Sequence, residues 1–302
     1  MEKKYNNVSV FSKILNQIIK LTSLKTNYLT EKNTKKLIQK TLNKKQKVPK
    51  IFALKMEKNT KMKVYSYNGS IEKPKEKIIV YLHGGAYIEE IVAFQIRFAM
   101  KIAKKNDTTL IIPIYPLAPK YTYKDTYDLM VDLYEQILKT EKDIYFLGAS
   151  AGGGFCLSYS MYLRENNKKQ PKKLLLLSPW LDITLENPLA KKIEKKDTSC
   201  AIEGTRYAGK LWAGESNLKN YLVSPLYGKF DDLPEITIAT GEFDTMQPDC
   251  LELSNILKKK KINHNYIEYK GQSHDFGIYP TKEGKLLIED FVEIIRGGDN
   301  NE

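Results

Sequence analysis

The 302-residue sequence has few of the features that mark several large classes of protein. It has three cysteines, Cys156, Cys200 and Cys250, which are far apart and in no metal-ligand spacing, so we expect reduced thiols. No apolar run approaches the roughly 18 residues that cross a bilayer, which excludes a membrane-spanning protein. The basic start is not followed by an uninterrupted apolar stretch, which argues against a cleaved secretory signal. These absences together favour a cytoplasmic location.

Arginine is also scarce, because only four of the 49 basic residues are arginine. The formal net charge is +13, and residues 1–50 carry 13 lysines against two acids, so nearly all of the excess lies in that segment. A nucleic-acid-binding protein uses arginine for bidentate contacts to bases and phosphates. We therefore expect no nucleic-acid partner.

The N-terminal segment shows the periodicity of amphipathic helices. Apolar residues recur at helical spacing in two groups, Phe11, Ile14, Leu15, Ile18 and Ile19, and then Leu37, Ile38 and Leu42 after a start at Thr30 or Asn33. The favoured interpretation is a helical arm packed on the main domain. The alternative is a basic amphipathic helix, within residues 1–45, that makes weak contact with anionic lipid.

The rest of the chain alternates between short apolar runs and helical patterns. The apolar runs predict strands at 61–67, 78–82, 109–114, 144–147, 173–177, 235–240 and 265–269. The helical patterns predict helices at 93–104, 123–138, 153–164, 249–259 and 281–295. This alternation predicts an α/β fold with a mostly parallel sheet. The polar, lysine-rich stretch 184–220 reads as a helical cap insertion. We expect a helical arm at 1–46 and a core at 47–183 and 221–302, with residues 297–302 a loose end.

The strongest local motif is the sequence Gly148-Ala149-Ser150-Ala151-Gly152, directly after one predicted strand and directly before a helix. This is the G-x-S-x-G nucleophile elbow in its strand–turn–helix context. Small residues around the serine let neighbouring backbone approach the sharp turn. The motif therefore predicts Ser150 as a nucleophile, with the N–H of Ala151 directed at the reacting carbonyl group.

A serine nucleophile needs a base that is oriented by a third group. Of the three histidines, His83 opens a glycine-rich turn and His264 begins a strand, whereas His274 follows the last predicted strand. Loops at the carboxyl ends of parallel strands collect catalytic groups, so His274 is the predicted base.

The orienting acid should follow a strand and lie between the serine and the histidine in the sequence. Asp244 meets both conditions, and its expected role is to hold the imidazole tautomer and stabilise the imidazolium. Glu242 and Asp182 are rivals, as is Asp249, for which a helix cap is the better interpretation.

A second glycine-rich loop, His83-Gly84-Gly85-Ala86-Tyr87, follows the strand predicted at 78–82. Backbone N–H groups of such a loop form an oxyanion hole in acyl-transfer enzymes. We expect Gly84, Gly85 and Ala86 to form it with Ala151, and His83 to hold the loop through hydrogen bonds. Two glycine-rich loops and an ordered Ser/Asp/His set at strand ends predict an enzyme.

These two loops resemble those of the hormone-sensitive-lipase-like esterases of the α/β-hydrolase fold. Further matching segments lie at 115–119, 178–182, 224–228 and 233–244, so the resemblance covers roughly residues 60–295. It departs at Ala86, where the family has a third glycine, and at Ala149, where it has aspartate. Neither change removes a backbone donor.

The resemblance implies hydrolysis of small or short-chain carboxylic esters through an acyl-enzyme on Ser150, without metal or organic cofactor. It implies that residues 1–46 and 184–220 form a cap over the acyl pocket. Tyr87 and, from the insertion, Tyr207, Leu211 and Trp212 are then candidate substrate-binding residues, although core packing explains the insertion residues nearly as well. The family also pairs as a homodimer through an edge strand or the last helix.

Other functions stay open at this point. An amidase or formamidase of the kynurenine-formamidase kind uses the same triad and a similar loop. A peptidase or a true lipase shares the chemistry, and the absence of a long apolar lid disfavours a lipase. A catalytically silent ligand-binding relative is disfavoured because every triad member is present.

Overall fold

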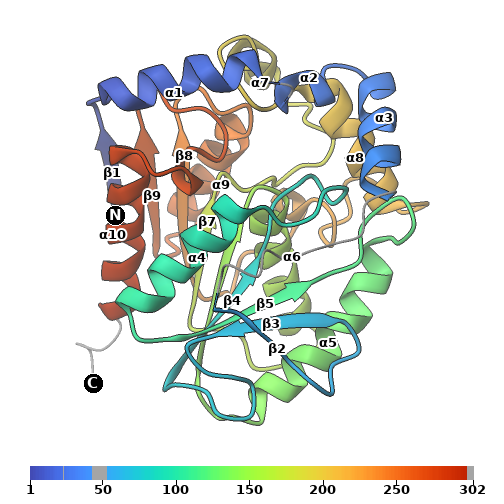
Figure 1. Ribbon diagram of the computed structural model, residues 1–302, viewed down its shortest axis with the longest axis vertical. Coiled ribbons are helices and arrows are strands. Elements are labelled where there is room, and N and C mark those ends of the chain that lie inside the picture. Colours follow the sequence, from blue (N-terminus) through green and yellow to red (C-terminus); the bar gives the residue numbers. More distant parts are fainter. Residues whose placement is uncertain (23, 43–52, 298–302) are drawn as a thin grey trace.

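In the computed structural model, which describes residues 1–22, 24–42 and 53–297, the chain forms a nine-stranded sheet with helices on both faces (Figure 1). The strand order is β1-β9-β8-β7-β6-β4-β5-β3-β2. The strands are β1 Glu2–Tyr5, β2 Lys55–Met56, β3 Lys63–Tyr67, β4 Lys77–Leu82, β5 Thr109–Ile114, β6 Asp143–Ala149, β7 Lys173–Leu177, β8 Glu235–Gly241 and β9 His264–Tyr269. All neighbouring strands from β1 to β5 in this order pair parallel, and β3 and β2 are antiparallel.

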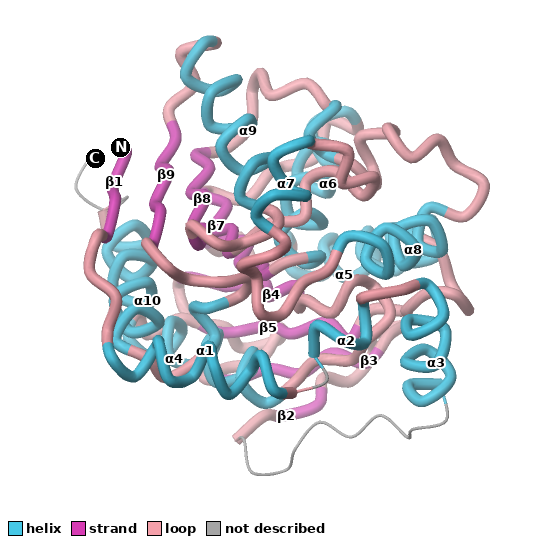
Figure 2. Tube along the Cα trace, turned by 90° about the horizontal axis from the view of Figure 1, so that it is seen from above, coloured by secondary structure: helices cyan, strands magenta, loops and turns pink. Residues whose placement is uncertain are grey.

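The helices divide between the two faces of the sheet, as Figure 2 shows from above. They are α1 Val10–Leu21, α2 Leu24–Tyr28, α3 Glu31–Leu42, α4 Ala93–Lys105, α5 Tyr123–Leu138, α6 Ala151–Glu165, α7 Pro188–Ile193, α8 Ile202–Ala213, α9 Gln247–Lys259 and α10 Lys282–Arg296. The core on one face joins the sheet to α4 and α10, and the core on the other joins it to α5, α6 and α9. The mostly parallel α/β fold predicted from the sequence is therefore confirmed.

The side chains of the central strands explain this two-sided core. In β4, Ile79 and Tyr81 belong to the core under α4 and α10, whereas Val80 and Leu82 belong to the core under α5 and α6. All four are fully buried. Successive residues of a strand point to opposite faces, so a strand covered on both sides needs apolar residues throughout.

The N-terminal segment differs from the prediction. Two helices were expected in a helical arm, and the structure has α1, α2 and α3. Before them, residues 2–5 form β1, which pairs with β9 and extends the sheet at its edge. This strand was missed because it has four residues, three of them charged, and gains its stability from contacts with residues distant in the sequence. The expected boundary at residue 46 lies outside the described residues, as do residues 298–302 of the expected loose end.

The insertion at 184–220 contributes α7 and α8, and α8 packs against α2 and α3. In Figure 1 these helices lie together at one end of the molecule, above the carboxyl ends of the central strands. Among the described helices, none is both long and apolar enough to cross a membrane.

Asp290 of α10 joins β1 to the core. Its buried carboxylate accepts hydrogen bonds from Lys3 Nζ at 2.5 Å, the Tyr5 hydroxyl at 2.9 Å and the Tyr269 hydroxyl at 2.6 Å. The rings of Tyr5 and Tyr269 stack with their centroids 4.5 Å apart. Removing the carboxylate leaves the buried Tyr269 hydroxyl and the partly buried Tyr5 hydroxyl without this acceptor, which costs about 1–3 kcal/mol.

We therefore expect Asp290→Ala to lower the free energy of unfolding by about 1–3 kcal/mol. Its neighbour Glu289 is half exposed and pairs with the half-exposed Lys105, so Glu289→Ala should cost no more than about 1 kcal/mol. Chemical denaturation of the two variants measures the difference. Equal losses of stability would show that the Asp290 cluster does not anchor β1.

Candidate active site

Ser150 occupies a sharp turn between β6 and α6. Its backbone has φ 53° and ψ −122°, in the left-handed half of conformational space that non-glycine residues rarely adopt. A Cβ atom on Gly152 would lie 2.0 Å from the carbonyl oxygen of Leu82, and one on Gly148 would lie 2.4 Å from the carbonyl oxygen of Gly152. The first turn of α6 thus lies directly against the end of β4, and only glycine fits at the point of contact.

Three predicted residues meet at the carboxyl end of the sheet. The Ser150 hydroxyl lies 2.8 Å from His274 Nε2, and His274 Nδ1 lies 2.9 Å from Asp244 Oδ1. Asp244 is fully buried, and its two oxygens also accept from the N–H of Met246 at 2.8 Å and the hydroxyl of Thr240 at 3.3 Å. This is the geometry in which a histidine takes a proton from a serine and a carboxylate stabilises the resulting cation.

Electrostatics favour the charged form of the imidazole. Burial disfavours that charge, but the carboxylates of Asp244, Asp275 and Asp197 outweigh burial and raise the pKa of His274 above its ordinary value. Burial also opposes ionisation of Asp244, and the charge and hydrogen bond of His274 hold the pKa of that carboxyl below its usual range. The same carboxylates would stabilise the imidazolium that forms when a neutral His274 takes a proton from Ser150.

Two of these carboxylates were not singled out from the sequence. Asp275 Oδ2 lies 4.0 Å from His274 Nε2, and burial raises the pKa of Asp275 to about 6. Its position next to the predicted base was a signal that could have identified it. Asp197 lies in the lysine-rich insertion, where no local pattern marks it.

Asp197 connects the insertion to the two loops that carry Asp244 and His274. Its buried carboxylate accepts from the backbone N–H of Thr245 at 2.8 Å and of Ser199 at 3.0 Å, and more distantly from that of His274 at 3.4 Å. The Ser199 hydroxyl in turn donates to the carbonyl oxygen of His274 at 3.1 Å. Burial and the charge of Asp244 raise the pKa of Asp197. The insertion therefore helps to fix the positions of the loops that carry the predicted acid and the predicted base.

The rival acids lie elsewhere. Glu242 accepts from the backbone N–H of Gly271 at 2.9 Å, and Asp182 accepts from the Tyr227 hydroxyl at 3.0 Å. Asp249 was expected to cap a helix, but α9 begins two residues earlier, so Asp249 lies in its first turn. Burial raises the pKa of Asp249 to about 7.

The other two histidines have structural contacts. His83 is fully buried, lies 2.8 Å through Nδ1 from the carbonyl oxygen of Gly84, and stacks on Tyr115. Burial lowers the pKa of His83 to about 4, so its ring is neutral at pH 7 and holds the loop. His264 Nε2 lies 2.9 Å from the hydroxyl of Ser254.

The expected oxyanion loop lies against Ser150. A Cβ atom on Gly84 would lie 3.1 Å from the Cβ of Ser150 and 3.0 Å from the carbonyl oxygen of Ala149, so a side chain there would force the loop or the serine to shift by a few tenths of an ångström. Gly85 and Ala86 both have positive φ, at 120° and 50°, and line the same cavity as Ser150. Ala151 is the first residue of α6, where backbone N–H groups have no acceptor within the helix. Their role as oxyanion donors stays a prediction.

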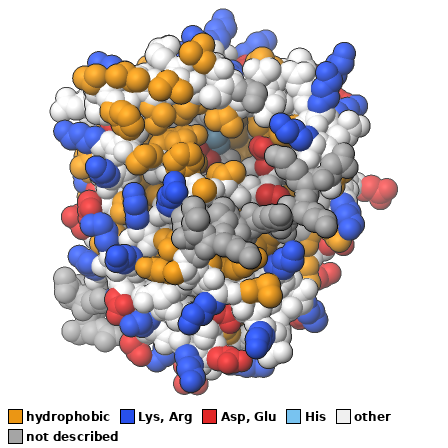
Figure 3. Space-filling model, in the orientation of Figure 1, with side chains coloured by type: hydrophobic (Ala, Val, Ile, Leu, Met, Phe, Trp, Pro, Cys, Tyr) orange, Lys and Arg blue, Asp and Glu red, His pale blue; other side chains and the backbone are white. Residues whose placement is uncertain are grey.

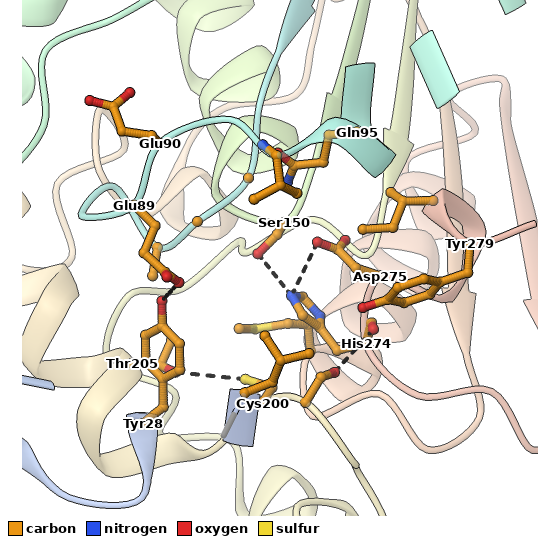
Figure 4. Close-up of a pocket in the computed structure, with 18 residues that line it drawn as sticks. Tyr28, Glu89, Glu90, Gln95, Ser150, Cys200, Thr205, His274, Asp275 and Tyr279 are labelled. Carbon is orange, nitrogen blue, oxygen red and sulfur yellow. Dashed lines mark hydrogen bonds and ion pairs between the residues drawn. The ribbon is translucent and has the colours of Figure 1, made fainter. Parts of the chain in front are cut away.

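A cavity of about 160 Å³ opens above Ser150 (Figure 4). Ser150, His274, Asp275 and Tyr279 form one side of it in the view, and Tyr28 and Glu89 form the other. The Tyr28 hydroxyl donates to Glu89 Oε2 at 2.5 Å, so α2 closes the cavity against the loop that follows β4.

The four residues expected to bind substrate lie away from this cavity. Tyr87 and Trp212 are buried and stack on each other with ring centroids 4.2 Å apart. Tyr207 and Leu211 are partly buried against the same core, with Lys35 over the Tyr207 ring. The cavity is lined instead by other side chains, among them Gln95, Cys200, Thr205 and Met246. Spacing in α8 shows which residues face inward, but not whether they meet a cavity or a neighbouring ring.

The chain is similar to known proteins in both sequence and structure. The family described as alpha/beta hydrolase fold matches residues 79–278. An esterase of Acinetobacter venetianus is 25% identical over 232 residues, which are 72% of this chain and 74% of the relative.

Solved structures are similar over nearly the whole chain. A candidate esterase from Staphylococcus aureus superimposes with a TM-score of 0.84 at 25% identity, covering 95% of this chain and 98% of the other. An esterase from the bacterial hormone-sensitive lipase family superimposes with a TM-score of 0.78 at 21% identity, covering 96% and 99%. At 21% identity, the similarity to this second structure shows only that the fold is shared.

The pKa of the base gives a testable pH dependence. His274 accepts a proton only when it is neutral, so reaction of Ser150 with an organophosphonate should accelerate as the pH rises, with a midpoint above 6.5. Asp275→Asn removes a negative charge near Nε2, lowers the pKa of His274 and should move the midpoint down by about one unit or more.

Asp128→Asn removes the same charge at an exposed position on α5 and should leave the midpoint unchanged. Labelling rates followed by mass spectrometry between pH 5 and pH 10 compare the three proteins. A midpoint that Asp275→Asn leaves in place would contradict the assigned electrostatic role.

Proposed function

Because the chain belongs to the alpha/beta hydrolase fold family, we propose that it is a serine carboxylesterase that cleaves small or short-acyl-chain carboxylic esters. The observation that carries this proposal is the hydrogen-bonded series from Ser150 through His274 to the buried Asp244, at the base of a cavity. The names of the relatives support an ester as the substrate and do not favour the amidase alternative.

In the first half of the reaction, Ser150 Oγ attacks the ester carbonyl carbon and its proton passes to His274 Nε2. The carbonyl oxygen becomes an alkoxide, which accepts hydrogen bonds from backbone N–H groups of the loop at 84–86 and of Ala151. When the tetrahedral intermediate collapses, the alcohol leaves with the proton from His274 and the acyl group stays on Ser150. Asp244 stabilises the imidazolium throughout.

In the second half, water attacks the acyl-enzyme while His274 takes one of its protons. The intermediate collapses to the free acid, and the proton returns to Ser150. Asp197 positions the loops that carry Asp244 and His274, so the insertion acts on the reaction through the triad rather than by touching the substrate.

The size of the cavity supports a short acyl group. Its volume of about 160 Å³ is close to the roughly 150 Å³ of an engineered protein cavity that holds one benzene molecule. An acyl chain of a few carbon atoms fits within this space, whereas a long fatty acyl chain would extend out of the mouth of the cavity. Homodimer formation and a cytoplasmic location stay predictions.

The direct test is hydrolysis of p-nitrophenyl acetate, butyrate, octanoate and palmitate. We expect kcat/KM to be highest for the acetate or butyrate and to fall for the longer esters. Ser150→Ala should lower kcat by several orders of magnitude, on the order of 10⁶ in a well-studied serine protease.

Ser160→Ala provides the matched control, because Ser160 is a buried serine of the same helix whose hydroxyl donates to Gln170 rather than to the triad. It should keep most of the activity. The matched anilide, p-nitroacetanilide, measures the amidase alternative. A wild-type protein that hydrolyses none of the esters, or a Ser150→Ala variant as active as wild type, would contradict the proposal.

A further inference from the structure

Helix α1 exposes a continuous apolar stripe. Val10, Phe11, Ile14, Ile18 and Leu21 are 71%, 53%, 51%, 53% and 88% exposed. At about 100° per residue these five side chains fall within a sector of about 100° of the helix. Figure 3 shows hydrophobic side chains gathered at the end of the molecule where Figure 1 places α1. A helix of a globular protein normally turns such a face toward the core, so this orientation needs an explanation.

Polar contacts on the opposite side hold α1 in this orientation. The Glu283 carboxylate of α10 accepts from the Ser9 N–H at 2.5 Å, from the Ser9 hydroxyl at 2.8 Å and from the hydroxyl of the buried Ser12. The Asn16 amide donates to the carbonyl oxygen of Gly271 at 3.3 Å. Because the cap and one polar edge of the helix are bound to the protein, the apolar stripe faces outward.

The stripe leads to the mouth of the active-site cavity. Leu24, which begins the next helix, is 38% exposed and lines the cavity, as does the 48% exposed Val92. Phe94, 40% exposed, contacts the ring of Tyr279 on the cavity wall, with centroids 5.3 Å apart. An apolar surface that continues into the substrate cavity allows the alcohol part of a large ester to leave the cavity without meeting water.

The charge beside the stripe indicates what covers it. Lys13 and Lys20 are exposed on the flank of α1. An amphipathic helix with an apolar face and flanking lysines lies in the interface of anionic lipid, its apolar face buried by about 5–10 Å. A second copy of the chain fits less well, because a stable dimer buries about 20–30 residues a side whereas the stripe has five.

We propose that α1 docks the protein on an anionic lipid surface, and that its substrates include short-acyl esters of amphiphilic alcohols resident in that surface. The substrate part rests on the proposed esterase function, and the docking part stands on the exposed stripe and its lysines. In this arrangement the cavity accepts the acyl group and the stripe holds the apolar alcohol at the surface. Bond making and bond breaking are those of the esterase reaction.

The docking test uses co-sedimentation with vesicles of phosphatidylcholine alone and of phosphatidylcholine with phosphatidylglycerol. The wild type should bind the anionic vesicles more strongly. Ile14→Glu/Ile18→Glu places two charges in the stripe and should lower the partition coefficient by roughly tenfold or more. Met56→Glu, at a 61% exposed apolar residue on the opposite edge of the sheet, should bind as the wild type does.

Two substrates separate docking from catalysis. Hydrolysis of soluble p-nitrophenyl acetate without vesicles should be equal in the wild type and in Ile14→Glu/Ile18→Glu, which also shows that the variant is folded. Hydrolysis of hexadecyl acetate in anionic vesicles should fall in the stripe variant only.

Docking is overturned if the wild type does not bind the vesicles, or if the stripe variant binds them equally well. It is also overturned if the stripe variant converts a wild-type dimer to a monomer in sedimentation analysis, because a second copy then covers the stripe. Vesicle binding without hydrolysis of either ester would reject the esterase proposal and leave docking in place. Hydrolysis of hexadecyl acetate that is equal in both proteins would reject the substrate class.

Discussion

The active site depends on one backbone-to-backbone contact, between the first turn of α6 and the end of β4. At Gly152 a single added carbon atom would lie 2.0 Å from the carbonyl oxygen of Leu82, so any side chain there would force the helix away from the sheet. The same contact holds Ser150 at positive φ and brings the loop after β4 against it. The strained turn at Ser150 and the close approach of the loop at 84–86 therefore depend on one contact between backbone segments, which is flanked by fully buried apolar strands.

Near this contact, three carboxylates act on the imidazole of His274. The carboxylates of Asp244, Asp275 and Asp197 all raise the pKa of His274. Asp275 is the next residue in the sequence, whereas Asp244 and Asp197 come from distant parts of the chain. Asp197 belongs to the insertion and accepts hydrogen bonds from the backbone of the loops that carry Asp244 and His274. The insertion thus does more than cover the cavity, because it sets the positions and the electrostatics of the acid and the base.

Much of this could be predicted from the sequence, and the exceptions have a common physical cause. The central strands and the loops at their ends follow from apolar periodicity and local turn chemistry, and these led to Ser150, Asp244 and His274. The features that the sequence did not predict depend on contacts between residues that are far apart in the chain. Strand β1 exists through pairing with β9, and α1 turns its apolar face outward because of Glu283, some 270 residues away in sequence. Tyr87 and Trp212 stack in the core, which spacing alone could not distinguish from a pocket wall.

The central claim is that Ser150 carries the acyl group during catalysis. The most direct measurement is mass spectrometry of protein quenched in acid within milliseconds of mixing with p-nitrophenyl butyrate, followed by proteolysis. The account predicts one butyryl group per chain, on the peptide that contains Ser150, and its absence in Ser150→Ala. A butyryl group on another residue, or hydrolysis of the ester with the acyl group never found on Ser150, would contradict it.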